Sequence, residues 1–258
     1  MKIFVAIWAF VGLLLTGTVA TAQTGKPTIV LVHGAFADSS SWYGVITILE
    51  RNGYSVIAAA NPLRSVKGDA DTVRALLTSI NTPIVLVGHS YGGMVISSAA
   101  NGQANVKALV YVAAFAPEAG ENAGNLNSKF PGSLVGPALA PPVPLLGGGH
   151  DLYVQQEKFH DAFAPDLPAD AARLAAAAQR PVTDIAFSEP ATEPAWKTIP
   201  SWFVYGDRDT AIPPQLHAFM AQRARPRATL VVEGASHVVM ISHSEAVAKV
   251  VEDAAAAR

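Results

Sequence analysis

Short apolar runs rich in β-branched residues alternate along the chain with segments of helical periodicity. Continuous apolar runs between turn residues are typical of strands buried on both faces, as in a parallel sheet covered by helices. The pattern predicts strands over residues 28–32, 54–60, 84–87, 106–114, 201–205 and 228–232. It predicts helices over residues 41–51, 68–80, 92–101, 214–223 and 243–257, the first capped by Ser40 or Ser41. This alternation indicates an α/β fold with a mostly parallel central sheet and helices on both faces.

One long stretch breaks this alternation. The window 131–149 holds five prolines and five glycines. Because proline fixes φ and lacks an N–H, we expect no regular element there. Residues 169–179 are alanine-rich and predicted to be helical. Residues 116–196 therefore read as an insertion lying over the sheet, which in a hydrolase would be a cap or lid. The alternative is an ordinary long surface excursion.

The N-terminus has the pattern of a secretory signal peptide. Lys2 supplies a positive charge, residues 3–15 are apolar, and Ala20-Thr21-Ala22 provides an A-x-A end. The apolar run is shorter than the roughly 20 residues that a membrane span needs. We expect residues 1–22 to be removed and residues 23–258 to form the mature domain. The protein would then be exported to a bacterial periplasm or the medium, without stable membrane insertion after cleavage.

Composition excludes several function classes. The chain has 258 residues, 18 Lys and Arg against 20 Asp and Glu, and a formal net charge of −2, so no basic surplus favours nucleic-acid binding. Half of the residues are hydrophobic, which excludes a disordered chain. The absence of cysteine excludes disulfides, thiolate metal sites and a cysteine nucleophile.

Residues 88–92, Gly-His-Ser-Tyr-Gly, match the G-x-S-x-G pattern of a serine nucleophile. The match directly follows a predicted strand and directly precedes a predicted helix, which is the context that the pattern requires. Gly88 and Gly92 lack side chains that would collide across a strained turn, and the helix N-terminus favours negative charge near Ser90. The alternative is a glycine-rich turn with a capping serine. We expect His89 to be structural.

Residues 33–36, His-Gly-Ala-Phe, follow the first strand of the predicted domain. A glycine turn here would aim a backbone N–H at the space above Ser90. The N–H groups of Ala35 and Tyr91 are the expected oxyanion donors, with Phe36 as the alternative to Ala35. We expect His33 to hydrogen-bond the loop rather than to act as a base.

The acid and the base are expected after the nucleophile, in the order Asp or Glu and then His. His237 follows the last predicted strand and is the expected general base, whereas His243 is expected to be a cap or surface group. Asp209 follows the preceding strand and is the expected acid, which holds the histidine tautomer. Asp207 is expected to bond its own turn or its arginine neighbour, and Glu118 is a third choice.

The sequence resembles the α/β-hydrolase superfamily over nearly all of the predicted mature chain. The resemblance is carried by four blocks, residues 32–36, 88–93, 206–213 and 234–237. More narrowly, the sequence resembles small bacterial esterases related to plant methylesterases and hydroxynitrile lyases. The resemblance implies a Ser90–Asp209–His237 triad with Ala35 and Tyr91 as oxyanion donors. It implies hydrolysis of small to medium carboxylic esters, a small-molecule substrate, without a metal or an organic cofactor.

The resemblance leaves other chemistries to weigh. Hydroxynitrile lyases of this group tend to place Thr after the first-strand His and Lys after the catalytic His, where this chain has Gly34 and Val238. A lysine would supply positive charge for departing cyanide, so Val238 disfavours the lyase. Cofactor-free perhydrolases and haloperoxidases share the triad and remain alternatives. A non-catalytic ligand-binding protein that keeps the hydrolase pocket is a further one.

Overall fold

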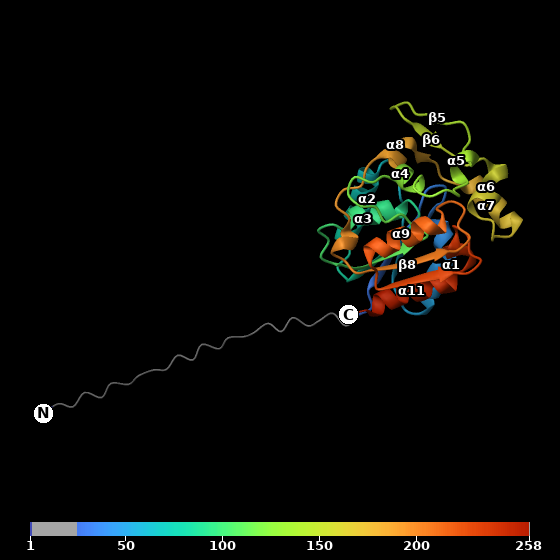
Figure 1. Cartoon of the computed structure of the whole chain (residues 1–258). Coiled ribbons are helices and arrows are strands. Elements are labelled where there is room, and N and C mark those ends of the chain that lie inside the picture. The colour runs from blue at the N-terminus through green and yellow to red at the C-terminus, as the bar shows by residue number, and fades with distance from the viewer. Residues whose placement is uncertain (2–24, 258) are drawn as a thin grey trace.

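Six strands form one sheet in the order β2-β1-β3-β4-β8-β9, and every neighbouring pair runs parallel (Figure 1). The computed structural model describes Met1 and residues 25–257, so the predicted leader lies outside the described residues apart from Met1. The strands are β1 (Thr28–Val32), β2 (Val56–Ala59), β3 (Ile84–His89), β4 (Val106–Val112), β8 (Ser201–Gly206) and β9 (Ala228–Val232). None of the helices in the described part of the chain is both long enough and apolar enough to span a membrane.

Helices cover both faces of this sheet. Every residue of β1 and of β3 is buried, and because successive side chains of a strand point to opposite faces, both faces must be covered. Helix α2 packs on α3, α1 packs on α11, and both α3 and α11 contact β3 and β4. The helices are α1 (Tyr43–Arg51), α2 (Val66–Thr78), α3 (Gly92–Ala99), α9 (Pro214–Ala224), α10 (Val239–Ser242) and α11 (Ser244–Ala256). The prediction of a parallel α/β sheet with helices on both faces is confirmed.

The start of the first helix differs from the prediction. A 3-10 turn, η1 (Ser39–Trp42), precedes α1, and the Asp38 carboxylate accepts a hydrogen bond from the Ser40 backbone N–H. The expectation that Ser40 or Ser41 caps the helix was therefore wrong. Asp38 is two to three residues earlier and takes the capping role, because an ionised carboxylate is a strong acceptor for the free N–H groups of a first turn.

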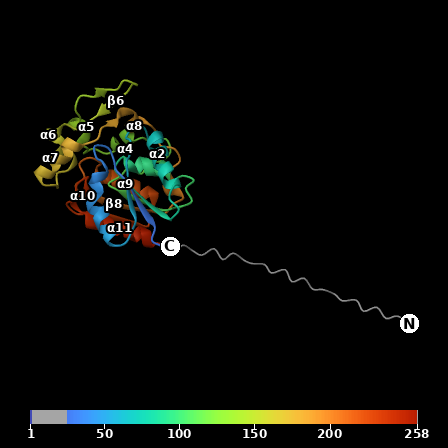
Figure 2. The same cartoon turned by 180° about the vertical axis from the view of Figure 1, so that it is seen from behind.

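The segment between β4 and β8 carries its own elements, which are called the cap from here on. They are α4 (Ala123–Asn127), α5 (Val135–Ala138), β5 (Val143–Pro144), β6 (His150–Leu152), α6 (Gln156–Phe163), α7 (Ala169–Ala178), β7 (Val182–Thr183), α8 (Asp184–Ser188) and η2 (Ala195–Lys197). Strands β5, β6 and β7 form a small antiparallel sheet. Figures 1 and 2 show α5, α6, α7 and β6 gathered at the end of the molecule opposite α11.

The expectation that residues 131–149 form no regular element was wrong, because they contain α5 and β5. Both elements are very short. Pro144 lies in β5, which is an edge strand of the small sheet. At an edge, the missing proline N–H removes no ladder bond, so the strand tolerates it.

Polar contacts tie the cap to the core beside the loops that follow the central strands. Arg64, just before α2, pairs with Asp151 of β6 at 2.6 Å. Asp166, between α6 and α7, accepts hydrogen bonds from the Ser236 backbone N–H at 2.9 Å and from the Ser236 hydroxyl. Because Ser236 follows β9, the second contact holds the cap against the loop that carries the predicted base.

Candidate active site

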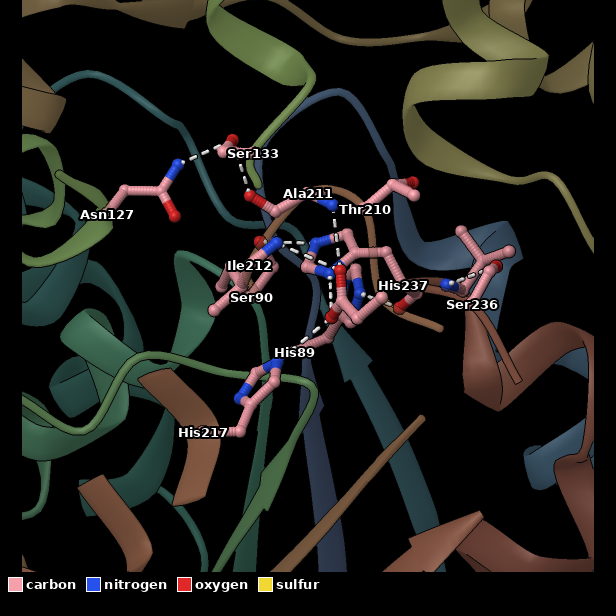
Figure 3. A network of polar contacts seen from close by, with 12 residues as sticks. His89, Ser90, Asn127, Ser133, Thr210, Ala211, Ile212, His217, Ser236 and His237 are labelled. Carbon is pink, nitrogen blue, oxygen red and sulfur yellow. Dashed lines mark hydrogen bonds and ion pairs between the residues drawn. The ribbon is translucent and has the colours of Figure 1, made fainter. Parts of the chain in front are cut away.

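The predicted site residues follow three strands whose carboxyl ends lie at the same edge of the sheet. Ser90 follows β3, Asp209 follows β8 and His237 follows β9. Parallel strands bring their carboxyl ends to one edge, where open α/β sheets bind ligands. Figure 3 shows Ser90 and His237 side by side above these strand ends, with Ala211 and Ile212 of the β8 loop beside them.

Ser90 sits on a strained turn between β3 and α3. Its φ is +52°, in the left-handed region that non-glycine residues rarely occupy and that costs about 1–3 kcal/mol. The turn is tight on both sides of the serine. A Cβ on Gly88 would lie 2.7 Å from the Gly92 carbonyl oxygen, and one on Gly92 would lie 2.5 Å from the Val32 oxygen. The two glycines let the chain close around Ser90 and present its hydroxyl at the start of α3.

Ser90, His237 and Asp209 form one hydrogen-bonded chain (Figure 3). The Asp209 carboxylate can only accept, so His237 Nδ1 carries a hydrogen and donates it to Asp209 Oδ2 at 2.8 Å. His237 Nε2 is then free to accept from the Ser90 hydroxyl, 2.9 Å away. All three residues are buried. This arrangement allows His237 to take the proton of Ser90.

Asp209 accepts four hydrogen bonds. Its Oδ1 accepts from the backbone N–H groups of Ala211 at 2.8 Å and Ile212 at 2.9 Å. Its Oδ2 accepts from His237 and also from His217 Nε2, at 2.9 Å. Burial alone would raise the pKa of Asp209, but the two histidines and their hydrogen bonds outweigh burial and lower it well below its usual value. Asp209 is therefore a stably charged acceptor at neutral pH.

His217 is a residue of this network that the sequence analysis did not single out. It lies in the first turn of α9, is fully buried, and its ring stacks on Tyr205 at 4.7 Å between centroids. Burial lowers its pKa, so His217 is neutral and Nε2 carries the hydrogen that it donates to Asp209. The available signal was its position eight residues after Asp209, at the start of the helix that the Asp209 loop leads into.

Two further histidines hold the loops around the site, in agreement with their expected structural roles. His33 Nε2 accepts from the Asn61 backbone N–H at 3.1 Å, so Nδ1 carries a hydrogen and donates it to the Gly34 oxygen at 2.9 Å. His89 Nε2 pairs with the His237 backbone oxygen at 3.1 Å and must donate to it. Burial lowers the pKa of both histidines, and both are neutral. His89 thus fixes the backbone of the predicted base.

The other residues considered for the acid and the base, Asp207, Glu118 and His243, make different contacts. Asp207 Oδ1 accepts from the Gly234 backbone N–H at 2.7 Å. The expectation that it bonds its own turn or its arginine neighbour was wrong, because β8 and β9 are adjacent and the loops after them pack together. Glu118 pairs with Lys197 at 2.8 Å. His243 precedes the first residue of α11 and is partly exposed, as expected of a cap or surface group.

The expected oxyanion donors are the backbone N–H groups of Ala35 and Tyr91. Among residues 25–257, the backbone N–H groups of Ala35 and Tyr91 make no backbone hydrogen bond, whereas that of Phe36 donates to the Arg180 oxygen of the cap at 3.1 Å. The alternative donor Phe36 was therefore wrong, because the cap occupies its N–H. Ala35 lines the same cavity as Ser90. Tyr91 directly follows Ser90, so both N–H groups remain candidates for binding a developing oxyanion.

Two cavities with shared lining residues lie at and beside the site. A small one of about 30 Å³ contains Ser90 and His237 and is otherwise lined almost entirely by apolar side chains. A larger one of about 320 Å³ lies between the cap and the core and is mainly apolar. Phe36 and Phe163 line both cavities, with their rings edge to face at 6.0 Å. In the described part of the chain, no group of three or more His, Asp or Glu side chains could hold a metal ion.

Comparison with protein-family models identifies the family of this chain. The model of the alpha/beta hydrolase family matches residues 29–250, a range that contains every site residue described above. The chain belongs to the alpha/beta hydrolase family. The parallel sheet, the strained serine turn and the cap between β4 and β8 are thus features of a hydrolase of this family.

Known proteins similar to this hydrolase include esterases and a lyase. Methylesterase 8 of Arabidopsis thaliana is 23% identical over 88% of this chain and 89% of its own length. The alpha-hydroxynitrile lyase of Arabidopsis thaliana is 26% identical over 84% of this chain and 92% of its own. The crystal structure of polyneuridine aldehyde esterase superposes with a TM-score of 0.75 at 18% identity, covering 89% of this chain and 99% of that one. This structural likeness shows the fold.

Proposed function

We propose that this hydrolase cleaves carboxylic esters through an acyl-enzyme on Ser90. The observation that carries the proposal is the continuous chain of hydrogen bonds from Ser90 through His237 to the charged Asp209, buried at the end of a small apolar cavity. The names of its relatives, which include methylesterases, support the same chemistry.

In the proposed reaction, Ser90 Oγ attacks the ester carbonyl carbon while His237 Nε2 takes the hydroxyl proton. The negative charge on the carbonyl oxygen is stabilised by the N–H groups of Ala35 and Tyr91, of which one is typically worth about 3–4 kcal/mol. His237 then gives its proton to the leaving alcohol as the C–O bond breaks. A water molecule repeats the sequence with His237 as base, which releases the acid and restores Ser90.

Both cavities favour an uncharged, largely apolar substrate. Ser90 and His237 line the small cavity, so the reacting ester group would bind there, and an apolar acyl or alcohol part would extend past Phe36 and Phe163 toward the larger cavity. Val238 is buried at the wall of the larger cavity, directly after the proposed base. A valine cannot supply the positive charge that departing cyanide would need, so ester hydrolysis is favoured over the lyase reaction.

The experiment measures p-nitrophenol release from p-nitrophenyl esters of increasing acyl length by residues 23–258, with Ser90→Ala beside the wild type. We expect turnover by the wild type and none by Ser90→Ala. Ser98→Ala, the same change on α3 outside both cavities, is the matched control and should retain activity. Undiminished activity of Ser90→Ala would refute the assignment of Ser90 as the nucleophile. If the wild type is inactive, peracid formation and cyanohydrin cleavage are the next assays.

We also propose export of this hydrolase, on the basis of the signal-peptide pattern of residues 1–22. Expression of the full chain in a bacterium, followed by N-terminal sequencing of the protein in the periplasm and medium, tests the proposal. A mature chain beginning at Gln23 is the expected result. An uncleaved chain confined to the cytoplasm would contradict it.

A further inference from the structure

One polar acceptor interrupts the apolar wall of the cavity around Ser90. Asn127, the last residue of α4, lines this cavity together with phenylalanine, alanine, valine and isoleucine side chains. Its side-chain oxygen Oδ1 is buried and has no hydrogen-bond partner among residues 25–257. Buried polar groups of folded proteins are nearly always hydrogen-bonded, so an unpaired acceptor beside a reactive serine calls for an explanation.

The orientation of the Asn127 amide is set by its neighbours. The Ser133 hydroxyl donates its single hydrogen to the Ala211 backbone oxygen at 2.8 Å. The Ser133 oxygen can therefore only accept from Asn127, and it does so from Nδ2 at 2.9 Å. A reversed amide would place two acceptors against each other. In Figure 3 the Asn127 nitrogen points to Ser133, and its oxygen points to the side on which Ser90 and Ile212 lie.

We propose that Asn127 Oδ1 accepts a hydrogen bond from a hydroxyl group of the substrate. The inference rests on the proposed function and names the substrate class, esters that carry a hydroxyl near the ester carbonyl on an otherwise apolar body. The hydroxyl must be near the carbonyl because Asn127 and Ser90 line the same cavity of about 30 Å³. The apolar body would extend into the larger cavity beyond Phe36 and Phe163.

This contact provides selectivity that apolar walls do not. An apolar pocket discriminates weakly between a substrate and its analogue with one added hydroxyl, whereas a site built to hydrogen-bond the hydroxyl rejects analogues without it. An ester lacking the donor leaves Oδ1 buried and unpaired in the complex, which costs binding free energy. The hydroxy ester is therefore expected to react faster than an analogue of the same shape and electronic character.

The test compares three methyl esters: methyl 2-hydroxy-3-phenylpropanoate, its 2-methoxy analogue and methyl 3-phenylpropanoate. The methoxy group withdraws electrons as the hydroxyl does but has no hydrogen to donate, so it controls for intrinsic reactivity. Acid release is followed for each separate enantiomer of the first two esters. We expect kcat/KM of the better hydroxy enantiomer to exceed that of the matching methoxy ester roughly 10- to 100-fold.

Asn127→Leu keeps the size of the side chain and removes the acceptor. We expect the hydroxy-to-methoxy ratio of kcat/KM to fall to near 1 in this variant. Asn125→Leu, the same substitution at an exposed position of α4, is the matched control and should keep the wild-type ratio. Ser133→Ala frees the Asn127 amide to rotate and should lower the ratio part of the way. It provides a second variant should Asn127→Leu not fold.

A wild-type ratio near 1, or a ratio that Asn127→Leu leaves unchanged, would overturn the inference and leave the ester hydrolase standing. Absence of any turnover by the wild type would instead refute the proposed function. Binding then decides the inference, because Ser90→Ala can be titrated calorimetrically with the same esters. Tighter binding of the hydroxy ester than of the methoxy ester, lost in Ser90→Ala/Asn127→Leu, supports the contact, and equal binding refutes it.

Discussion

Replacing His217 by phenylalanine isolates one hydrogen bond of the charged Asp209. Phenylalanine keeps a ring that can stack on Tyr205 but removes the Nε2–H that Asp209 Oδ2 accepts at 2.9 Å. Three of the four donors to this carboxylate remain. Loss of a hydrogen bond to a buried charged group costs about 1.5–3 kcal/mol of stability. For a domain of this size the melting temperature should fall by roughly 3–12 °C.

The pH dependence of this effect follows from the lowered pKa of His217, which burial causes. Below about pH 6.5 the unfolded wild type binds a proton at this position that the folded protein does not bind. The contribution of His217 to stability is therefore fully present above about pH 6.5 and is lost as the pH falls toward its folded-state pKa. His217→Phe has no group that takes up this proton, so its stability does not fall in the same way. The difference in free energy of unfolding between the wild type and the variant should therefore shrink by up to about 1.4 kcal/mol per pH unit as the pH falls.

The assay is urea unfolding of wild type, His217→Phe and His217→Gln, followed by circular dichroism at about pH 8 and about pH 5.5. Glutamine retains an N–H that can reach Asp209 and should recover much of the stability at the higher pH. A phenylalanine variant as stable as the wild type at about pH 8 would refute the reasoning. A deficit that grows as the pH falls would show that His217 is charged in the folded protein.

Three further substitutions test other parts of the site. Gly93→Ala would place a Cβ 2.0 Å from the Phe115 carbonyl oxygen, so we expect a loss of about 2–3 kcal/mol in urea unfolding, and wild-type stability would contradict the close approach. Tyr91→Phe removes the hydroxyl bond to Asp69 at 2.9 Å but keeps the backbone N–H; stability should fall by about 1–3 kcal/mol with kcat nearly unchanged, and a lost kcat would show that the hydroxyl takes part. Asp166→Ala releases the loop before the proposed base and should lower kcat roughly 10-fold with little change in KM; an unchanged kcat would mean that the cap does not position this loop.

The strands of the central sheet could be predicted because the pattern that indicates them lies in neighbouring residues. A strand buried on both faces must be apolar at consecutive positions, and residues 28–32, all of them buried, were predicted with the bounds that the structure has. Residues 228–232 form the edge strand β9 and were also predicted with their observed bounds, although four of the five residues are exposed. Helix starts were less predictable, since Asp38 caps the first turn in competition with the serines that follow it. The elements within the Pro- and Gly-rich window 131–149 were not predicted, because α5 and β5 are short. They are held by contacts with other segments of the cap, which a local sequence pattern does not show.

The three central site residues could be predicted because each lies in the loop or turn that follows a strand. Parallel strands order their carboxyl ends at one edge, so Ser90, Asp209 and His237 are brought together although Ser90 and His237 are 147 positions apart. The same reasoning failed for Asp207, whose partner is in the neighbouring loop. His217 escaped prediction because a single histidine in a helix has no pattern that distinguishes a buried partner of a carboxylate from a surface residue.

The sequence by itself determined the sheet, the serine turn and the order of the nucleophile, acid and base, because hydrophobic periodicity and strand ends are properties of neighbouring residues. Only the tertiary structure decided that Phe36 gives its N–H to the cap, that His217 shares Asp209 with His237, and that the Asn127 oxygen is left unpaired. Each of these depends on which donors and acceptors from distant segments are packed together and already engaged. Hydrogen-bonding capacity is set by residue type, but its use in a buried site is set by the fold.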